Sequence, residues 1–173
     1  THTTLGKLSG ERGKSVEPAK TPEEQFELYS VPSYPEKKPE VVSGKDVGSN
    51  KQLVDPRSVL LCKINPRINR AWVVGDFTAH TKIASTEWIV FPATDDVEPE
   101  FLCYFLQKNA VRDFLAHNAS GVGGSLMRVK PSTLRDFPFS YPKPKEQRQI
   151  VAEIEKQFSR LEEGVGALKR VQA

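Results

Sequence analysis

The hydrophobic and polar positions follow different patterns along the chain. Residues 1–57 alternate short apolar runs with stretches rich in Pro, Lys and Glu, which predicts short strands joined by long loops. Residues 58–94 are more strongly β-like, because runs rich in Val, Ile, Leu and Trp at 58–64, 71–74 and 87–91 are separated by turn-forming residues. We therefore expect a twisted, mostly antiparallel sheet.

The last third of the chain has the spacing of helices. Apolar residues between Phe101 and Leu115 recur on one helical face, and Glu98-Pro99-Glu100 is a favourable start, so one helix is expected from 98 to about 118. Alternation with flanking prolines at 137–141 predicts an edge strand, and a long helix is expected from Pro144 to the chain end. The pattern predicts an α+β fold: a sheet with a flanking helix, followed by a long C-terminal helix of the coiled-coil type.

The C-terminal helix carries a narrow apolar stripe. Its residues are spaced three and four apart in alternation, which is the a/d pattern of a coiled coil. The stripe consists of Val151, Ile154, Phe158, Leu161, Val165 and Leu168. A helix packed on its own domain would show the same stripe, but the narrowness and terminal position favour contact with another helix. Gly164 and Gly166 weaken a rigid rod, since each costs about 1 kcal/mol relative to Ala.

Composition places the chain among globular proteins. Hydrophobic residues make up 38% and charged residues 27% of its 173 residues, and no apolar run approaches the roughly 18 residues of a membrane helix. A net charge of +3 is too small to indicate nucleic-acid binding by itself. Cys62 and Cys103 lie among apolar residues, so we expect two buried free thiols in a reducing, cytoplasmic environment.

Motifs of catalysis and cofactor binding are incomplete. Residues 10–15 lack the first Gly of a phosphate-binding loop, because Leu8 occupies that position. The run Asn65-Pro66-Arg67-Ile68 lacks the second Pro and the aromatic residue of the adenine methyltransferase motif, and the histidines have no metal-ligand spacing. We expect a non-catalytic protein with no cofactor and no bound metal.

Several segments resemble the specificity subunits of Type I restriction-modification systems. The run from Pro142 through Glu146-Gln147 to Ile150-Val151 is similar to the signature that opens the family's conserved helix after each target recognition domain. The Gly-Ser loop at 120–125 and the segments at 60–64 and 85–90 also fit. The resemblance covers roughly residues 50–173. Lys145 departs from it, since the family more often has an apolar residue there.

The resemblance implies a role and an organisation. Residues 1–143 would form a target recognition domain, and residues 144–173 a conserved dimerisation or spacer helix. Such subunits read duplex DNA and dock the modification (methyltransferase) and restriction subunits. A complete subunit holds two recognition domains on two helices, so this chain is expected to be a fragment or a half-subunit that forms a homodimer through its C-terminal helix. The alternative is a coiled-coil scaffold or adaptor that does not bind DNA.

Candidate DNA-binding residues lie in polar loops between the expected strands. Arg and Asn can pair bidentately with guanine and adenine, so base contacts are expected from the loop at 63–70 through Lys63, Asn65, Arg67, Asn69 and Arg70. A second polar loop offers His80 and Lys82. Backbone amides and cations after the helix suit phosphate contacts, at Gly123, Gly124, Ser125, Arg128 and Lys130. Each segment could equally be a solvated loop or a flexible connector.

Overall fold

A computed structural model describes residues 1–9, 13–121 and 127–171 of the chain. Its strands are β1 (His2–Thr4), β2 (Ser15–Val16), β3 (Gln25–Tyr29), β4 (Glu40–Ser43), β5 (Lys51–Leu53), β6 (Val59–Cys62), β7 (Ala71–Val73), β8 (Thr81–Ser85), β9 (Trp88–Phe91) and β10 (Pro138–Ser140). Its α-helices are α1 (Leu5–Leu8), α2 (Pro99–Leu106), α3 (Asn109–His117) and α4 (Pro144–Val171). The 3₁₀ turns are η1 (Pro18–Lys20), η2 (Tyr34–Glu36), η3 (Gly44–Asp46), η4 (Pro66–Ile68) and η5 (Pro131–Leu134). The predicted α+β class, with a long C-terminal helix, is confirmed.

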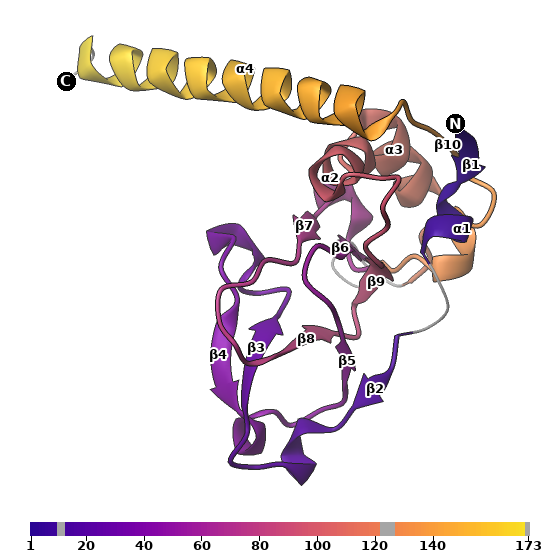
Figure 1. Cartoon of the computed structure of the whole chain (residues 1–173), viewed down its shortest axis with the longest axis vertical. Coiled ribbons are helices and arrows are strands. Elements are labelled where there is room, and N and C mark those ends of the chain that lie inside the picture. Colours follow the sequence, from indigo (N-terminus) through magenta and orange to yellow (C-terminus); the bar gives the residue numbers. More distant parts are fainter. Residues whose placement is uncertain (10–12, 122–126, 172–173) are drawn as a thin grey trace.

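The strands are divided among separate sheets, whereas the sequence pattern predicted one. A five-stranded sheet has the order β2-β5-β8-β3-β4, and a three-stranded sheet has the order β7-β6-β9. All pairs in these sheets are antiparallel except β3 with β8, so the predicted mostly antiparallel character is confirmed. The first and last strands, β1 and β10, pair with each other. Figure 1 shows this pair beside α3 and the five-stranded sheet at the opposite end of the molecule.

Strand β6 lies between two hydrophobic clusters, which explains its unbroken apolar sequence. Val59 and Leu61 face a cluster formed with α2 and α3, while Leu60 and Cys62 face the cluster of Trp72 and Trp88. A strand buried on both faces has no solvent side, and its residues therefore do not alternate with polar ones. Around β6, the two clusters join the helices to the sheets.

The single helix expected over 98–118 is two helices. α2 ends at Leu106, and Lys108 has extended backbone angles before α3 begins at Asn109. The break lets Leu102 and Leu106 of α2 reach the same cluster as Val111 and Leu115 of α3. The apolar spacing already departs from the helical period here, because Leu106 and Val111 are five positions apart.

The two cysteines differ in exposure. Cys62 is buried and free, as predicted, whereas Cys103 is also free but only partly buried, contrary to the prediction. Burial nevertheless raises the pKa of the Cys103 thiol to about 11, so it remains protonated at neutral pH.

Helix α4 runs without interruption through Gly164 and Gly166. Its first half packs against α2, and the rest projects away from the globular part of the molecule (Figure 1). Within the described ranges, no helix combines the length and the apolar character needed to cross a membrane.

Candidate nucleic-acid interface

The loop between β6 and β7 is held at its base by the segment that precedes η5. The amide of Lys63 donates to the Glu87 carbonyl (2.8 Å), and the amide of Val129 donates to the Lys63 carbonyl (3.0 Å). The Asn65 amide donates to the Met127 carbonyl (2.8 Å). These backbone bonds bring the predicted base-reading loop and the predicted phosphate-contacting stretch together, although 60 residues separate them in the sequence.

The tip of this loop has a defined conformation. Asn65 and Asn69 both have positive φ, 46° and 50°, on either side of η4. Asn tolerates this left-handed conformation better than most residues. The Asn69 Nδ2 donates to the carbonyl of Leu106 (3.0 Å), the last residue of α2, so Asn69 fixes the loop to the helix. Its Oδ1 is buried and has no partner within the described residues.

Arg67 and Ile68 are the exposed residues of the loop tip. Ile68 keeps 55% of its surface exposed. Arg70 has a different position, because its Nη1 donates to the Ile64 carbonyl (3.3 Å) and lies 3.8 Å from the Cys62 Sγ. Of the predicted base-reading residues, Arg67 therefore faces solvent, whereas Asn69 and Arg70 contact the protein itself.

Arg128 and Lys130 lie beside this loop. Arg128 forms two bonds with the Glu87 carboxylate, from Nε (3.2 Å) and from Nη2 (3.1 Å). Its side chain remains about half exposed, and Lys130 is exposed. Glu87 is a residue that sequence reasoning missed, because an acidic partner for Arg128 has no local signal. The predicted residues Gly123, Gly124 and Ser125 lie outside the described residues.

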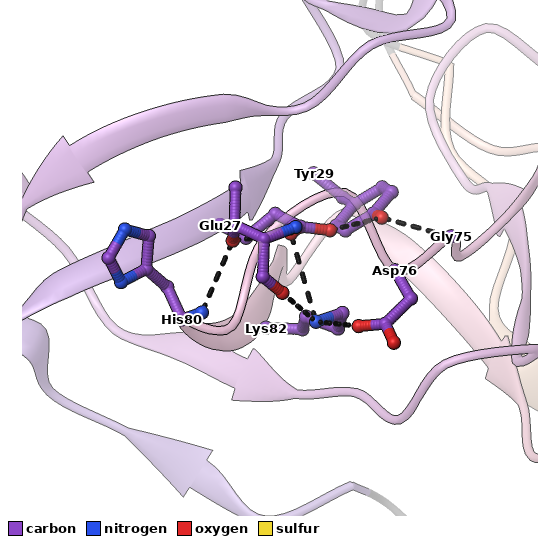
Figure 2. A network of polar contacts seen from close by, with 7 residues as sticks. Glu27, Tyr29, Gly75, Asp76, His80 and Lys82 are labelled. Carbon is purple, nitrogen blue, oxygen red and sulfur yellow. Dashed lines mark hydrogen bonds and ion pairs between the residues drawn. The ribbon is translucent and has the colours of Figure 1, made fainter.

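Lys82 does not lie on a polar loop, as the sequence suggested, but inside strand β8. Its ammonium is 2.7 Å from the Asp76 carboxylate and 3.7 Å from the buried Glu27 carboxylate, and it donates to the Thr78 carbonyl (2.9 Å). The side chain is almost fully buried. We therefore leave Lys82 out of the proposed DNA surface. His80 is exposed, and Figure 2 shows its ring pointing away from this network.

Glu27 holds the loop at 75–80 in place through hydrogen bonds. It accepts hydrogen bonds from the Tyr29 hydroxyl (2.7 Å) and from the Thr78 amide (2.8 Å) and hydroxyl (2.7 Å), as Figure 2 shows in part. Burial alone raises the pKa of Glu27, but the bonds from Tyr29 and Thr78, together with the Lys82 charge, leave it below its usual range. The Tyr29 hydroxyl also accepts from the Gly75 amide (2.9 Å). The network fixes the loop that carries His80.

The apolar stripe of α4 is covered over only part of its length. Val151 and Ile154 are partly buried, and Phe158 stacks on Tyr104 of α2 with ring centroids 6.2 Å apart. Beyond that contact, Leu161 is 62% and Leu168 is 66% exposed. The packing of the stripe on its own domain is therefore confirmed for the first half, whereas the second half has no partner within this chain's described residues.

These features define a class of protein: an α+β domain with a polar, cation-bearing loop cluster, carried at one end of a long amphipathic helix. The same fold occurs in solved structures. The chain is similar to the HsdS subunit from Thermoanaerobacter tengcongensis, with a TM-score of 0.76 and 21% identity over 94% of this chain. It is equally similar, with a TM-score of 0.77 and 21% identity, to a chain in a structure on complex assembly and conformational transition of the type I R-M system.

This chain spans 43% of the length of each of these two matches, which is somewhat less than half. The likeness shows that it has the fold of about half an HsdS subunit, in agreement with the resemblance found in the sequence. No protein-family model and no curated protein matches the sequence.

Proposed function

We propose that the chain is one recognition half of a Type I restriction-modification specificity subunit and binds duplex DNA in a sequence-specific manner. The observation that carries this proposal is the fold likeness to HsdS over nearly the whole chain. Residues 1–143 would form the recognition domain, and residues 144–173 the spacer and dimerisation helix. Its partners would be DNA and the modification and restriction subunits, which carry the chemistry; the chain itself would be non-catalytic, without a cofactor, and cytoplasmic.

The loop cluster supports a division of labour in DNA binding. Arg67 stands exposed on a rigid tip, as a side chain that reads base edges must. Arg128 and Lys130 lie beside it and suit phosphate contacts, which position a protein without reading sequence. Lys63, Asn65, Asn69 and Arg70 would shape this surface. His80, on the separate loop at 75–80, and Gly123, Gly124 and Ser125, which lie outside the described residues, would be further DNA contacts.

We propose further that two chains pair through α4 in an antiparallel homodimer. The 28 residues of α4 span about 42 Å at 1.5 Å per residue. Two such helices side by side could hold two recognition domains about one DNA turn, or about 34 Å, apart. The exposed half of the stripe, which includes Leu161, Val165 and Leu168, supports this pairing.

Two substitutions test the DNA-binding proposal. Arg67→Ala should change the preferred sequence at one base position, at a cost of about 1–3 kcal/mol for the favoured base. Lys130→Ala should weaken binding to all duplexes alike and flatten the salt dependence by roughly one unit. Selection from a random duplex library and titrations at several salt concentrations measure these effects. Lys45→Ala, which removes an exposed cation from η3, is the control.

The scaffold alternative predicts a different outcome. The exposed apolar half of α4 favours it, because such a surface also suits a protein partner. If no duplex is enriched under any condition, with or without the modification subunit, the DNA-binding proposal is wrong and the scaffold is favoured.

A further inference from the structure

The side chain of Gln147 joins the beginning of α4 to the rest of the molecule. It is fully buried, although it lies in the first turns of an otherwise exposed helix. Its Nε2 donates to the carbonyls of Asp96 (2.7 Å) and Pro142 (2.8 Å), and its Oε1 accepts from the Glu98 amide (2.8 Å). One side chain thus binds the backbone that leads into α2 and the backbone that leads into α4.

Charged side chains reinforce this joint only weakly. Glu98 pairs with Arg57 (3.1 Å) and with Arg148, but both Arg side chains are about 60% exposed. Exposed ion pairs contribute little to stability. The three bonds of Gln147 matter more, because its side chain is fully buried and its amide group has no water to replace a lost partner.

A second attachment lies farther along the helix. Phe158 stacks on Tyr104 eleven residues beyond Gln147, which is about 16 Å at the helical rise. Between the two attachments α4 is only partly covered: Val151 and Ile154 are partly buried, and an open groove of about 280 Å³ lies beside Val151. The direction of α4 thus depends on its two attachment points as well as on this partial packing.

We infer that Gln147, together with the Tyr104–Phe158 contact, fixes the direction of α4 and thereby sets the DNA spacing that the protein accepts. The inference rests on the proposed function. From Gln147 the helix extends about 36 Å, so a tilt of about 10° would move its end by about 6 Å, or nearly two base pairs. A helix that spaces two recognition domains needs a joint that resists such a tilt. Gln147 is in this sense a positioning residue, which need not touch DNA.

The direction of the helix can be measured without DNA. Spin labels at Lys38→Cys and Glu163→Cys, in a chain whose native cysteines are replaced by Ala, report the distance between the connection before β4 and distal α4. Dilution with unlabelled chain removes distances between protomers. Gln147→Ala should broaden the distance distribution roughly twofold, given the length of the lever. Tyr104→Ala should broaden it too, because it removes the second attachment without altering the stripe.

Gln149→Ala is the matched control, since Gln149 lies on the same turn and is exposed. It should leave the distribution unchanged. Urea unfolding shows whether each variant is folded before its distances are compared. If Gln147→Ala and Gln149→Ala give equal widths, Gln147 does not hold the helix and the inference is wrong.

Selection from random duplexes measures the gap between half-sites that the protein accepts. The unaltered dimer should accept one gap between its half-sites. Gln147→Ala should recover the same half-sites with gaps spread over about three or more lengths, because a freer tilt covers that range. If Gln147→Ala broadens the distance distribution but still accepts a single gap, the spacing role is wrong. If it broadens the distribution and neither the unaltered chain nor any variant enriches a duplex, Gln147 does hold the helix, but the proposed function is wrong.

Discussion

Two buried charges, Glu27 and Lys82, lie opposite each other in the parallel strands β3 and β8. Taking both out of water is costly, and the cost is offset only if their hydrogen-bonding groups are satisfied. Here the hydroxyls of Tyr29 and Thr78 and the Asp76 carboxylate complete the network (Figure 2). Such a network holds the loop at 75–80, which carries His80, in one conformation.

Glu27→Gln should destabilise the fold by about 3 kcal/mol, because removing one partner leaves a buried charge short of compensation. Urea unfolding at pH 7, followed by the fluorescence of Trp72 and Trp88, measures the loss. Glu23→Gln is the control, since Glu23 is exposed and its substitution should change the free energy of unfolding little. Equal losses for the two variants would mean that the buried pair contributes nothing.

The same pair predicts a pH dependence. The pKa of Glu27 is lower in the folded chain than its usual value of about 4.3 in an unfolded one. Its stabilising contribution is therefore complete above that unfolded pKa and is lost as the pH falls through the folded pKa. The difference in unfolding free energy between the unaltered chain and Glu27→Gln should stay constant from pH 5 to 8 and shrink below about pH 4. A difference that grows in acid would contradict the shift.

Residue types in the sequence indicated which side chains could contact DNA, but not which ones are free to do so. Arg67 and Arg70 look alike in the sequence, yet Arg70 is turned toward Ile64 and Cys62 by the fold of the loop. The sequence predicted Lys82 as a loop residue, whereas it lies in β8 and pairs with Glu27 of β3 and with Asp76 of the loop before β8. The sequence did carry one signal for this pair. Glu27 and Lys82 are charged residues inside apolar runs, and buried charges are nearly always paired.

At the scale of elements, the two halves of the α4 stripe have different surroundings. The first half of the stripe binds its own α2, and the second half is exposed. The heptad spacing of apolar residues predicted this helix, and its predicted start at Pro144 is confirmed. We expected one helix over 98–118 although the apolar spacing departs from the helical period between Leu106 and Val111, because the residues on either side of that departure keep the period and pack in one cluster. The spacing of apolar residues also does not show which part of the α4 stripe the domain covers.

Leu161→Asp should abolish the proposed homodimer, because it places a charge in the middle of the exposed seam. Light scattering should then give the mass of one chain, 19.4 kDa, in place of two. Ser159→Asp adds the same charge on an exposed position outside the stripe and should leave the dimer intact. An unaltered chain that stays monomeric at high concentration would refute the pairing.

At the scale of the whole molecule, the topology depends on contacts that no local pattern encodes. Strand β1 pairs with β10 across some 138 residues, and β3 pairs with β8 rather than only with its sequence neighbours. Strand alternation shows which residues can pair, but not which strands do so, because the same apolar faces fit several partners. The signature around Gln147 carried more information here, because the family it resembles implies an α+β fold followed by one long helix, and the chain has that fold.

The two-fold symmetry of an antiparallel dimer predicts the form of its DNA site. Each protomer would read the same half-site, and the symmetry axis would place the second copy on the opposite strand. The unaltered chain should therefore select a split palindrome with an unread gap. Leu161→Asp, as a monomer, should still select the half-site but with no second copy at a fixed distance. Selection from a random duplex library, with the modification subunit added where binding is weak, compares the two. Recovery of one continuous, asymmetric sequence by the unaltered chain would exclude the symmetric dimer, because a two-fold axis cannot generate such a site.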